Sequence, residues 1–281
     1  MKQKPKIGIM QGRLSKMVKN RIQIFPSYSW REEFEIASKN GFDTIEWIFD
    51  EIQPNPILNN DEITEIKQLR EKNQISINAI CADYFMIKKL FNESEIELEK
   101  NLEMIKKLII QANKLEITII EIPLVDSSSL KTDKNKKEIT NNLEKILPFA
   151  EENNVTIVLE TDLNPVNFKE FLVGFNHPYI MANYDSGNSA SLGYNSSEEL
   201  TILKKWIKNV HVKDRKFQGS TVPFGVGDTD FDTFFSSLSK INYSGDLIIQ
   251  GARFENEKIT PEDTCKIYQE FIKQNIDKHY I

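Results

Sequence analysis

The chain has 281 residues, of which 40% are hydrophobic and 28% are charged. These values suit an ordinary globular protein that buries a substantial core. The formal net charge of −6 disfavours general affinity for nucleic acid, which needs a basic face. Cys81 and Cys265 are the only cysteines, too few for a disulfide scaffold and not arranged as C-x-x-C. The sequence shows no signal peptide and no membrane span, so we expect a cytoplasmic protein that binds no membrane. Whether it forms a homo-oligomer stays open.

Short apolar segments rich in β-forming residues alternate along the chain with longer segments of helical period. We expect strands at residues 6–10, 44–48, 75–80, 117–122, 156–160, 179–185, 209–214 and 246–250. We expect helices at residues 30–40, 60–72, 94–115, 135–153, 165–174, 197–207, 230–240 and 261–277. The longest helical segment places Leu102, Ile105 and Ile109 on one face and charges on the other.

This regular alternation is typical of parallel βα units. Length alone allows either one (β/α)8 barrel or two smaller domains. Eight units without a linker rich in proline, serine or glycine favour the closed barrel over a doubly wound sheet. The sequence therefore predicts an α/β fold, a (β/α)8 TIM barrel that forms a single domain over residues 1–281.

Four of the expected strands end in side chains that can bind a metal ion. TIVLE stops at Glu160, IMANYD at Asp185 and DLIIQ at Gln250, while His211 lies in NVHVKD. The carboxyl ends of the strands of a parallel barrel converge on one face, where barrel enzymes have their active sites. Carboxylate and imidazole ligands that meet there suit a divalent cation.

The whole chain resembles the xylose isomerase-like barrels, a large group of sugar and sugar-phosphate isomerases and epimerases. The resemblance is carried in order by the segments KIGIMQGRLS, FDTIEWI, LETD, YDSGN, VHVKDR, PFGVGDTDF and LIIQGAR. It implies a glutamate, an aspartate, a histidine and a second glutamate on strands 5 to 8, holding manganese, magnesium, cobalt or zinc.

Three of these positions carry over to Glu160, Asp185 and His211, whereas the fourth is Gln250. The expected cofactor is therefore one divalent metal ion (Mn, Mg, Co or Zn), with Gln250 either a neutral carbonyl ligand or a residue that has lost the role. The resemblance also implies that Glu46 and Asn188 contact sugar hydroxyls.

Each of these residues has an ordinary structural alternative. Glu160 and Asp185 could cap helices or form ion pairs, as acids often do where a strand leads into a helix. His211 could be a core histidine bonded to a carbonyl group, and Asn188 a turn residue after Gly187. Their joint position at the strand ends favours the metal site.

Basic residues also follow the expected strands. Arg13 follows the first, Lys213 and Arg215 the seventh, and Arg253 the eighth. Guanidinium groups bind phosphate or carboxylate in bidentate fashion, and barrels often bind phosphate near strands 7 and 8. They indicate an anionic or polyhydroxyl substrate, although Lys213 could instead pair with Asp214 and the arginines could be solvated.

The leading hypothesis is a metal-dependent isomerase or epimerase that acts on a sugar or sugar phosphate through an enediolate, with Glu160 as the base. Isomerisation is favoured over epimerisation because Gln250 supplies no second base. A keto-polyol dehydratase and a non-catalytic sugar-binding barrel are the alternatives. DNA-repair endonucleases of this fold use many histidines, and this chain has three.

Overall fold

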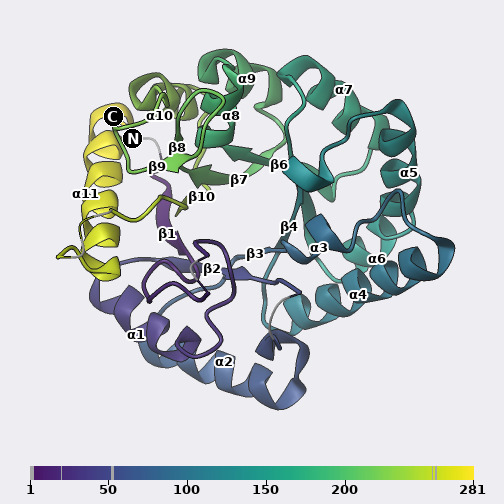
Figure 1. The fold of residues 1–281 in the computed structure, drawn as a ribbon, viewed down its shortest axis with the longest axis horizontal. Helices are drawn as coiled ribbons and strands as arrows, with labels where there is room; N and C mark the ends of the chain where they lie inside the picture. The colour runs from purple at the N-terminus through teal and green to yellow at the C-terminus, as the bar shows by residue number, and fades with distance from the viewer. Residues whose placement is uncertain (1–2, 20, 52–53, 255, 257) are drawn as a thin grey trace.

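The computed structural model describes residues 3–19, 21–51, 54–254, 256 and 258–281, and its central feature is a closed parallel barrel (Figure 1). Around the barrel the strands follow the order β1-β10-β7-β6-β5-β4-β3-β2. Their bounds are β1 Lys6–Met10, β2 Thr44–Ile48, β3 Ala79–Cys81, β4 Ile119–Leu124, β5 Thr156–Thr161, β6 Ile180–Asp185, β7 Ile207–Val212 and β10 Asp246–Ile249. The predicted barrel is confirmed.

Helices surround the barrel in chain order (Figure 1). They are α1 Trp30–Lys39, α2 Asn60–Asn73, α3 Tyr84–Ile87, α4 Glu95–Lys114, α5 Asp133–Glu144, α6 Leu147–Glu152, α7 Pro165–Phe175, α8 Ser186–Leu192, α9 Ser196–Leu203, α10 Phe231–Lys240 and α11 Pro261–His279. Two 3-10 turns, Pro56–Leu58 and Asp126–Ser128, and a small antiparallel pair, β8 Asp214–Arg215 with β9 Thr221–Val222, complete the described elements.

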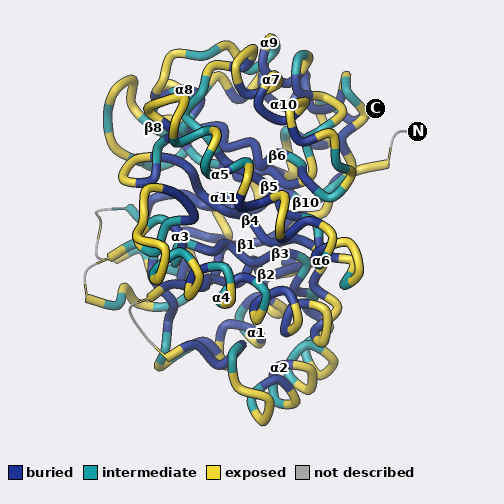
Figure 2. Tube along the Cα trace, turned by 90° about the vertical axis from the view of Figure 1, so that its right-hand side faces the viewer, coloured by how far each residue is buried: buried dark blue, intermediate teal, exposed yellow. Residues whose placement is uncertain are grey.

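The strands are buried on both faces, as expected for a barrel enclosed by helices (Figure 2). β2 and β4 are buried along their whole length. Gly8 shows how closely the layers pack, because a Cβ at that position would lie 2.5 Å from the side chains of Thr44 and Ile248. Polar side chains inside this apolar barrel therefore need partners.

Some expected boundaries were wrong, each for a local reason. The third strand is restricted to Ala79–Cys81, although Ser76 forms an isolated bridge with Thr44. The helix expected at 135–153 is two helices, because Pro148 lies at the start of α6 and lacks the N–H that continuation requires. The segment 186–192 is a helix that the sequence did not predict, and Asp185 caps it.

The loop after β1 is held in place by a buried glutamate and a half-buried arginine. Glu33 accepts hydrogen bonds from the Gly12 N–H (2.9 Å) and from Ser15 Oγ (2.8 Å), while Arg253 donates to the Gly12 carbonyl at 2.6 Å. Gly12 has φ +81°, a left-handed conformation that glycine adopts without strain. The loop is thereby fixed over the mouth of the barrel.

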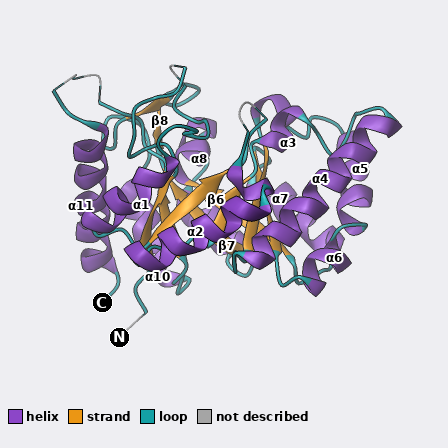
Figure 3. Ribbon diagram, turned by 90° about the horizontal axis from the view of Figure 1, so that it is seen from below, coloured by secondary structure: helices purple, strands orange, loops and turns teal. Residues whose placement is uncertain are grey.

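The β8–β9 pair lies on the side of the molecule away from both termini (Figure 3).

A buried acid joins α9 to α8 and β6. Glu199 Oε2 accepts hydrogen bonds from Tyr184 Oη at 3.0 Å and from Ser189 Oγ. Burial raises the pKa of Glu199 to about 7, although these hydrogen bonds oppose the shift. Because the folded protein holds this proton more tightly than the unfolded chain, the contribution to stability is full below the unfolded pKa. It is lost as the pH rises through about 7.

We expect Glu199→Gln to flatten the pH dependence of stability. Between pH 5 and pH 8 the wild-type free energy of unfolding should fall relative to the variant by up to roughly 3 kcal/mol. Urea unfolding at both pH values measures this difference. Glu198→Gln, a change of the exposed neighbour, is the control and should follow the wild type. Parallel profiles for wild type and Glu199→Gln would contradict the assignment.

Candidate metal and substrate site

Glu160, Asp185 and His211 converge at the carboxyl end of the barrel. They lie near or at the ends of the adjacent strands β5, β6 and β7, and one ligand atom from each lies within 4.8 Å of the other two. His211 Nδ1 is 3.4 Å from Glu160 Oε2 and 4.0 Å from Asp185 Oδ2. All three residues are buried. The parallel register therefore produces the cluster that the sequence indicated.

The His211 ring is oriented by groups deeper in the barrel. Its Nε2 lies 3.0 Å from Glu46 Oε2, and Asn209 Nδ2 donates to both Glu46 oxygens at 3.2 and 3.3 Å. Burial alone would lower the pKa of His211, but the charges of Glu46 and Glu160 raise it well above its usual value. Glu46 thus lies beneath the imidazole, fully buried, and is not among the pocket-lining residues. Its contact is with the histidine.

Asp185 divides its two oxygens between structure and site. Oδ1 caps α8 by accepting from the N–H groups of Gly187 (2.9 Å) and Asn188 (2.8 Å). Oδ2 is 2.7 Å from Lys213 Nζ, an ion pair without the alignment of a hydrogen bond. Helix capping, which the sequence suggested, therefore uses only Oδ1 of this carboxylate. The other oxygen, Oδ2, lies beside Lys213 and His211.

Glu160 is held by two amides. Its Oε2 accepts from Asn183 Nδ2 at 2.7 Å, and its Oε1 accepts from Asn188 Nδ2. Burial alone would raise the pKa of Glu160, but the hydrogen bond and charge of His211, with Lys213 and Asn183, lower it to about 2. The carboxylate is therefore ionised at neutral pH, the form that a base or a metal ligand requires.

The donor set fits a divalent cation. Manganese, magnesium, cobalt and zinc differ in their preference for oxygen or nitrogen donors, and two carboxylates with an imidazole supply both kinds. Gln250, directly after β10, lines the same pocket, and its Oε1 is buried without a hydrogen-bond donor among the described residues. An amide oxygen can complete such a set, since hard cations accept carbonyl ligands.

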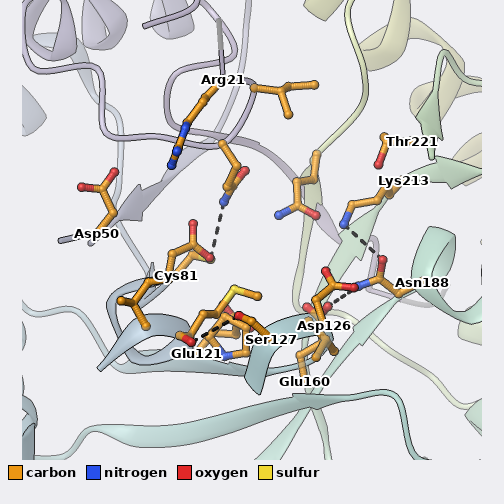
Figure 4. A pocket seen from close by; sticks show the side chains of 18 of the residues that line it. Arg21, Asp50, Cys81, Glu121, Asp126, Ser127, Glu160, Asn188, Lys213 and Thr221 are labelled. Carbon is orange, nitrogen blue, oxygen red and sulfur yellow. Dashed lines mark hydrogen bonds between the residues drawn. The ribbon is translucent and has the colours of Figure 1, made fainter. Parts of the chain in front are cut away.

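Of the four proposed ligands, Glu160 and Gln250 line a cavity of about 810 Å³ at the barrel mouth (Figure 4). Asp185 and His211 are buried beside it, where His211 lies against Glu160 and Asp185 against Lys213. The volume of the cavity falls in the range of small-molecule sites. Among the described residues its polar lining consists of Arg13, Arg21, Gln23, Asp50, Glu51, Asp83, Glu121, Asp126, Ser127, Glu160, Asn188, Lys213, Arg215, Ser220, Thr221 and Gln250.

Of the basic residues predicted near the site, Lys213 and Arg215 line this pocket and are linked to the cluster. Arg215 Nη1 donates to Asn188 Oδ1 at 2.7 Å, and the Asn188 amide in turn donates to Glu160. Lys213 Nζ lies near Asp185 and 3.5 Å from Asn188 Oδ1. Lys213 therefore pairs with Asp185, whereas Asp214 binds the backbone of Gly225 and Gly227.

Arg13 and Arg253 serve the loop after β1. Arg13 lines the pocket, but its Nη1 donates to the Ile22 carbonyl and its Nη2 to Gln23 Oε1 at 2.7 Å. Arg253 donates to the Gly12 carbonyl and is not among the lining residues. Arg253 thus lies beside Arg13 at this loop and outside the pocket lining that Lys213 and Arg215 share.

Sequence reasoning missed Asn183 and Asn209, both buried. Asn183 Nδ2 bridges Glu160 Oε2 and His211 Nδ1, and Asn209 holds Glu46. Each lies two residues before a proposed ligand on its strand, so its side chain points to the same face. That period-2 spacing was a usable signal. Glu121 forms a second buried group with Glu46 and His211.

Comparisons with known proteins agree with the fold. The family model of the xylose isomerase-like TIM barrel matches residues 34–273. L-ribulose-5-phosphate 3-epimerase UlaE of Escherichia coli (strain SMS-3-5 / SECEC) is 26% identical over 240 residues, which cover 79% of this chain and 81% of UlaE.

Two solved structures share the fold. A structure of L-ribulose 3-epimerase has a TM-score of 0.78 at 17% identity and covers 98% of this chain and 95% of its own. The IOLI protein, solved with a bound zinc atom, has a TM-score of 0.78 at 18% identity and covers 98% and 99%.

The fold and the buried carboxylate–imidazole cluster define a TIM barrel with a candidate metal centre at the carboxyl ends of its strands. More particularly, the chain belongs to the xylose isomerase-like TIM barrel family. No helix in the described part of the chain is long and apolar enough to cross a membrane.

We expect Glu46→Gln to weaken divalent-metal binding on the order of 10- to 100-fold, because a carboxylate behind a ligating histidine orients the ring and raises its basicity. Competition with a chromogenic zinc chelator measures the dissociation constant. Glu51→Gln, an equal change of charge at an exposed position that pairs with Lys88, is the control. Equal affinities for the two variants would contradict the position assigned to Glu46.

Proposed function

We propose that the protein is a metal-dependent isomerase or epimerase that acts on a sugar or sugar phosphate through an enediolate. The observation that carries the proposal is the buried cluster of Glu160, Asp185 and His211, of which Glu160 lines a pocket of about 810 Å³ at the barrel mouth. Family membership and the name of the relative UlaE, an L-ribulose-5-phosphate 3-epimerase, support a sugar as substrate.

Glu160, Asp185 and His211 would hold the cation, with the amide oxygen of Gln250 as a fourth ligand. When bound, a divalent cation supplies a Lewis acid that polarises the carbonyl group of a sugar. The buried, unpaired Oε1 of Gln250 supports its inclusion. One divalent ion of the manganese, magnesium, cobalt or zinc type fits these oxygen and nitrogen donors.

Glu160 would move the proton. Its ionised carboxylate takes the proton from the carbon next to the carbonyl group, and the electron pair of that C–H bond forms the enediolate. The same carboxyl group returns the proton to the neighbouring carbon, and the proton of the adjacent hydroxyl group passes to the former carbonyl oxygen, which together complete an aldose–ketose isomerisation. Asn183 and Asn188 hold both carboxylate oxygens and so limit the orientations from which the base acts.

Isomerisation is favoured over epimerisation because of Gln250. Epimerisation removes a proton from one face of a carbon and returns one to the opposite face, which calls for a second acid–base group. The amide of Gln250 cannot hold a proton near neutral pH. A single base on one side of the substrate is sufficient for transfer between adjacent carbons.

Epimerisation is the second candidate, and a specific observation favours it. Glu121 and Asp83 line the same pocket on β4 and after β3, across the barrel from β10 and β7 respectively. Burial raises the pKa of Asp83 to about 6, although hydrogen bonds with Gln23 and Cys81 oppose the shift. A carboxyl group of that pKa suits proton transfer near neutral pH.

We expect Glu160→Gln to lower kcat on the order of 10²- to 10⁴-fold at saturating metal, the usual value of a positioned acid–base group. Glu51→Gln, which removes a carboxylate from the rim of the same pocket, is the matched control and should retain most activity. Steady-state assays on a panel of ketopentoses, ketohexoses and their phosphates, including L-ribulose and L-ribulose 5-phosphate, provide the measurement. Retained activity in Glu160→Gln would exclude Glu160 as the base.

The same reaction in D₂O separates isomerisation from epimerisation. NMR should show deuterium incorporation together with migration of the carbonyl group, both lost after metal removal with a chelator. Inversion of one stereocentre without carbonyl migration would decide for epimerisation. In that case Asp83→Asn and Glu121→Gln identify which carboxyl group is the second acid–base. The absence of turnover and exchange with every sugar tested would favour the non-catalytic sugar-binding alternative.

Gln250→Glu tests the fourth ligand. We expect the variant to bind manganese on the order of tenfold more tightly, because the ligand charge changes from −2 to −3 while a carboxylate oxygen keeps the position of the amide oxygen. Isothermal titration calorimetry gives the affinity, and Gln23→Glu, which adds a carboxylate elsewhere in the pocket, controls for general charge. An unchanged affinity would place Gln250 outside the metal site.

A further inference from the structure

We propose that the barrel interior holds a second site for a divalent cation, formed by Glu46, Glu121 and the Nε2 atom of His211. This inner site lies on the opposite edge of the imidazole ring from the outer site, that of Glu160 and Asp185, which face Nδ1. The inference goes beyond the proposed function, which needs only the cation on the Nδ1 side.

Three strands spaced around the barrel supply the inner site (Figure 1). Glu46 lies on β2, Glu121 on β4 and His211 on β7, and one or two strands separate each pair of these. Inward side chains from strands so placed meet near the barrel axis. One ligand atom from each residue lies within 4.8 Å of the other two, and Glu46 Oε2 is 3.0 Å from His211 Nε2. Atoms that bind one ion at about 2.0–2.6 Å lie about 3–4 Å from one another, so small side-chain movements suffice to surround it.

Glu121 is the residue whose surroundings point to a bound ion. Its exposed fraction is 0%, and neither carboxylate oxygen accepts a well-formed hydrogen bond from a described residue, although the Cys81 thiol lies beside it. A thiol is a weak donor and cannot replace the water that a carboxylate loses on burial. Buried charged groups are otherwise paired or bind metal ions, so this carboxyl group calls for a partner.

The inner site lies one layer of side chains below the outer site. Glu121 pairs in register with Val158, which comes two residues before Glu160 on β5. Glu121 and Glu160 both border the pocket at the barrel mouth. An ion can therefore reach the inner site through the same opening that serves the outer one, which meets the requirement of an entry path.

The two carboxylates of the inner site lack a full counter-charge. Asn209 Nδ2 donates to both oxygens of Glu46 at 3.2 and 3.3 Å, whereas Glu121 has no comparable donor in the described part of the chain. The imidazole of His211 is shared with the carboxylates of the outer site. Neighbouring carboxylates out of water are costly unless a positive charge lies between them. A divalent cation supplies that charge, and zinc accepts carboxylate and imidazole ligands.

The inner and outer sites share one imidazole ring. In a neutral imidazole one nitrogen can bind a metal ion, while the other carries the proton. A cation on Nε2 of His211 leaves the proton on Nδ1, beside Glu160, and removes the ring from the outer site. A cation on Nδ1 leaves the proton on Nε2, which faces Glu46. The two sites thus compete for His211, and a cation in the inner site weakens the outer one.

A variant without the outer carboxylates tests the inner site. Glu160→Gln and Asp185→Asn together remove both negative charges, and asparagine keeps an oxygen that can cap α8. We expect this double variant still to bind about one zinc ion per chain through Glu46, Glu121 and His211. Isothermal titration calorimetry with zinc alone gives the affinity and the stoichiometry. Absence of zinc binding by the double variant would overturn the inference, and a proton retained by Glu121 would then account for its missing partner.

The ring nitrogen that binds zinc distinguishes the two sites. Long-range proton–nitrogen NMR correlation reports the state of each ring nitrogen, and the chain has three histidines to resolve. We expect zinc on Nε2 of His211 in the double variant and on Nδ1 in the wild type at equimolar zinc. Zinc on Nδ1 in the double variant would contradict the inner site. Zinc away from Nδ1 in the wild type would instead contradict the outer site and the proposed function, so the two failures are distinguishable.

Loss of Glu121 tests its place among the ligands. Adding Glu121→Leu to the double variant removes both oxygens and keeps a side chain of similar size in this buried position. Zinc affinity should fall by more than the roughly 10- to 100-fold that loss of a group behind a ligand costs, because a ligand itself is lost. Glu51→Leu in the same background removes an exposed carboxylate that lines the pocket and is the control. Equal affinities for the two triple variants would exclude Glu121 as a ligand.

Discussion

The structure depends on one buried imidazole. His211 is fully enclosed, with Glu46 on its Nε2 side and Glu160 and Asp185 on its Nδ1 side. Carboxylates taken out of water in this way are tolerated only where positive charge and hydrogen bonds compensate them. The imidazole, the Lys213 ammonium group and the amides of Asn183, Asn188 and Asn209 provide that compensation. The polar interior of the barrel is therefore one connected network.

This network also fixes the orientation of the residues that contact the proposed ligands. Asn183 bridges Glu160 and His211. Arg215 donates to Asn188, whose amide in turn donates to Glu160. A buried polar group without its partner costs about 1–3 kcal/mol, so each member stabilises the orientation of the next. The arginine that the sequence suggests for binding an anion instead fixes the orientation of the proposed base.

The fold and the ligand cluster were predictable because both follow from periodic features. Buried parallel strands give continuous apolar segments, and a parallel barrel brings the ends of such segments together, so Glu160, Asp185 and His211 could be placed before any coordinates were known. The direction of individual donors was not predictable. Arg253 follows a strand end as Arg215 does, yet it binds the Gly12 carbonyl, because the loop after β1 folds back across the mouth. A sequence shows which cations lie near a site and not which acceptors already occupy them.

Gln250 has a consistent place in this charge balance. A carboxylate at its position would add a fourth negative charge to the group formed by Glu46, Glu160 and Asp185. Glu121 lines the same pocket, and burial together with the charge of Glu160 already raises its pKa. The neutral amide supplies an oxygen without that charge. The imidazolium form of His211, which its raised pKa favours, and the Lys213 ammonium group beside Asp185 then balance the carboxylates. A divalent cation bound there would replace the imidazolium proton as the balancing charge, because a ligating histidine must be neutral. Metal binding and the protonation of His211 are thus alternative ways to neutralise the same buried carboxylates.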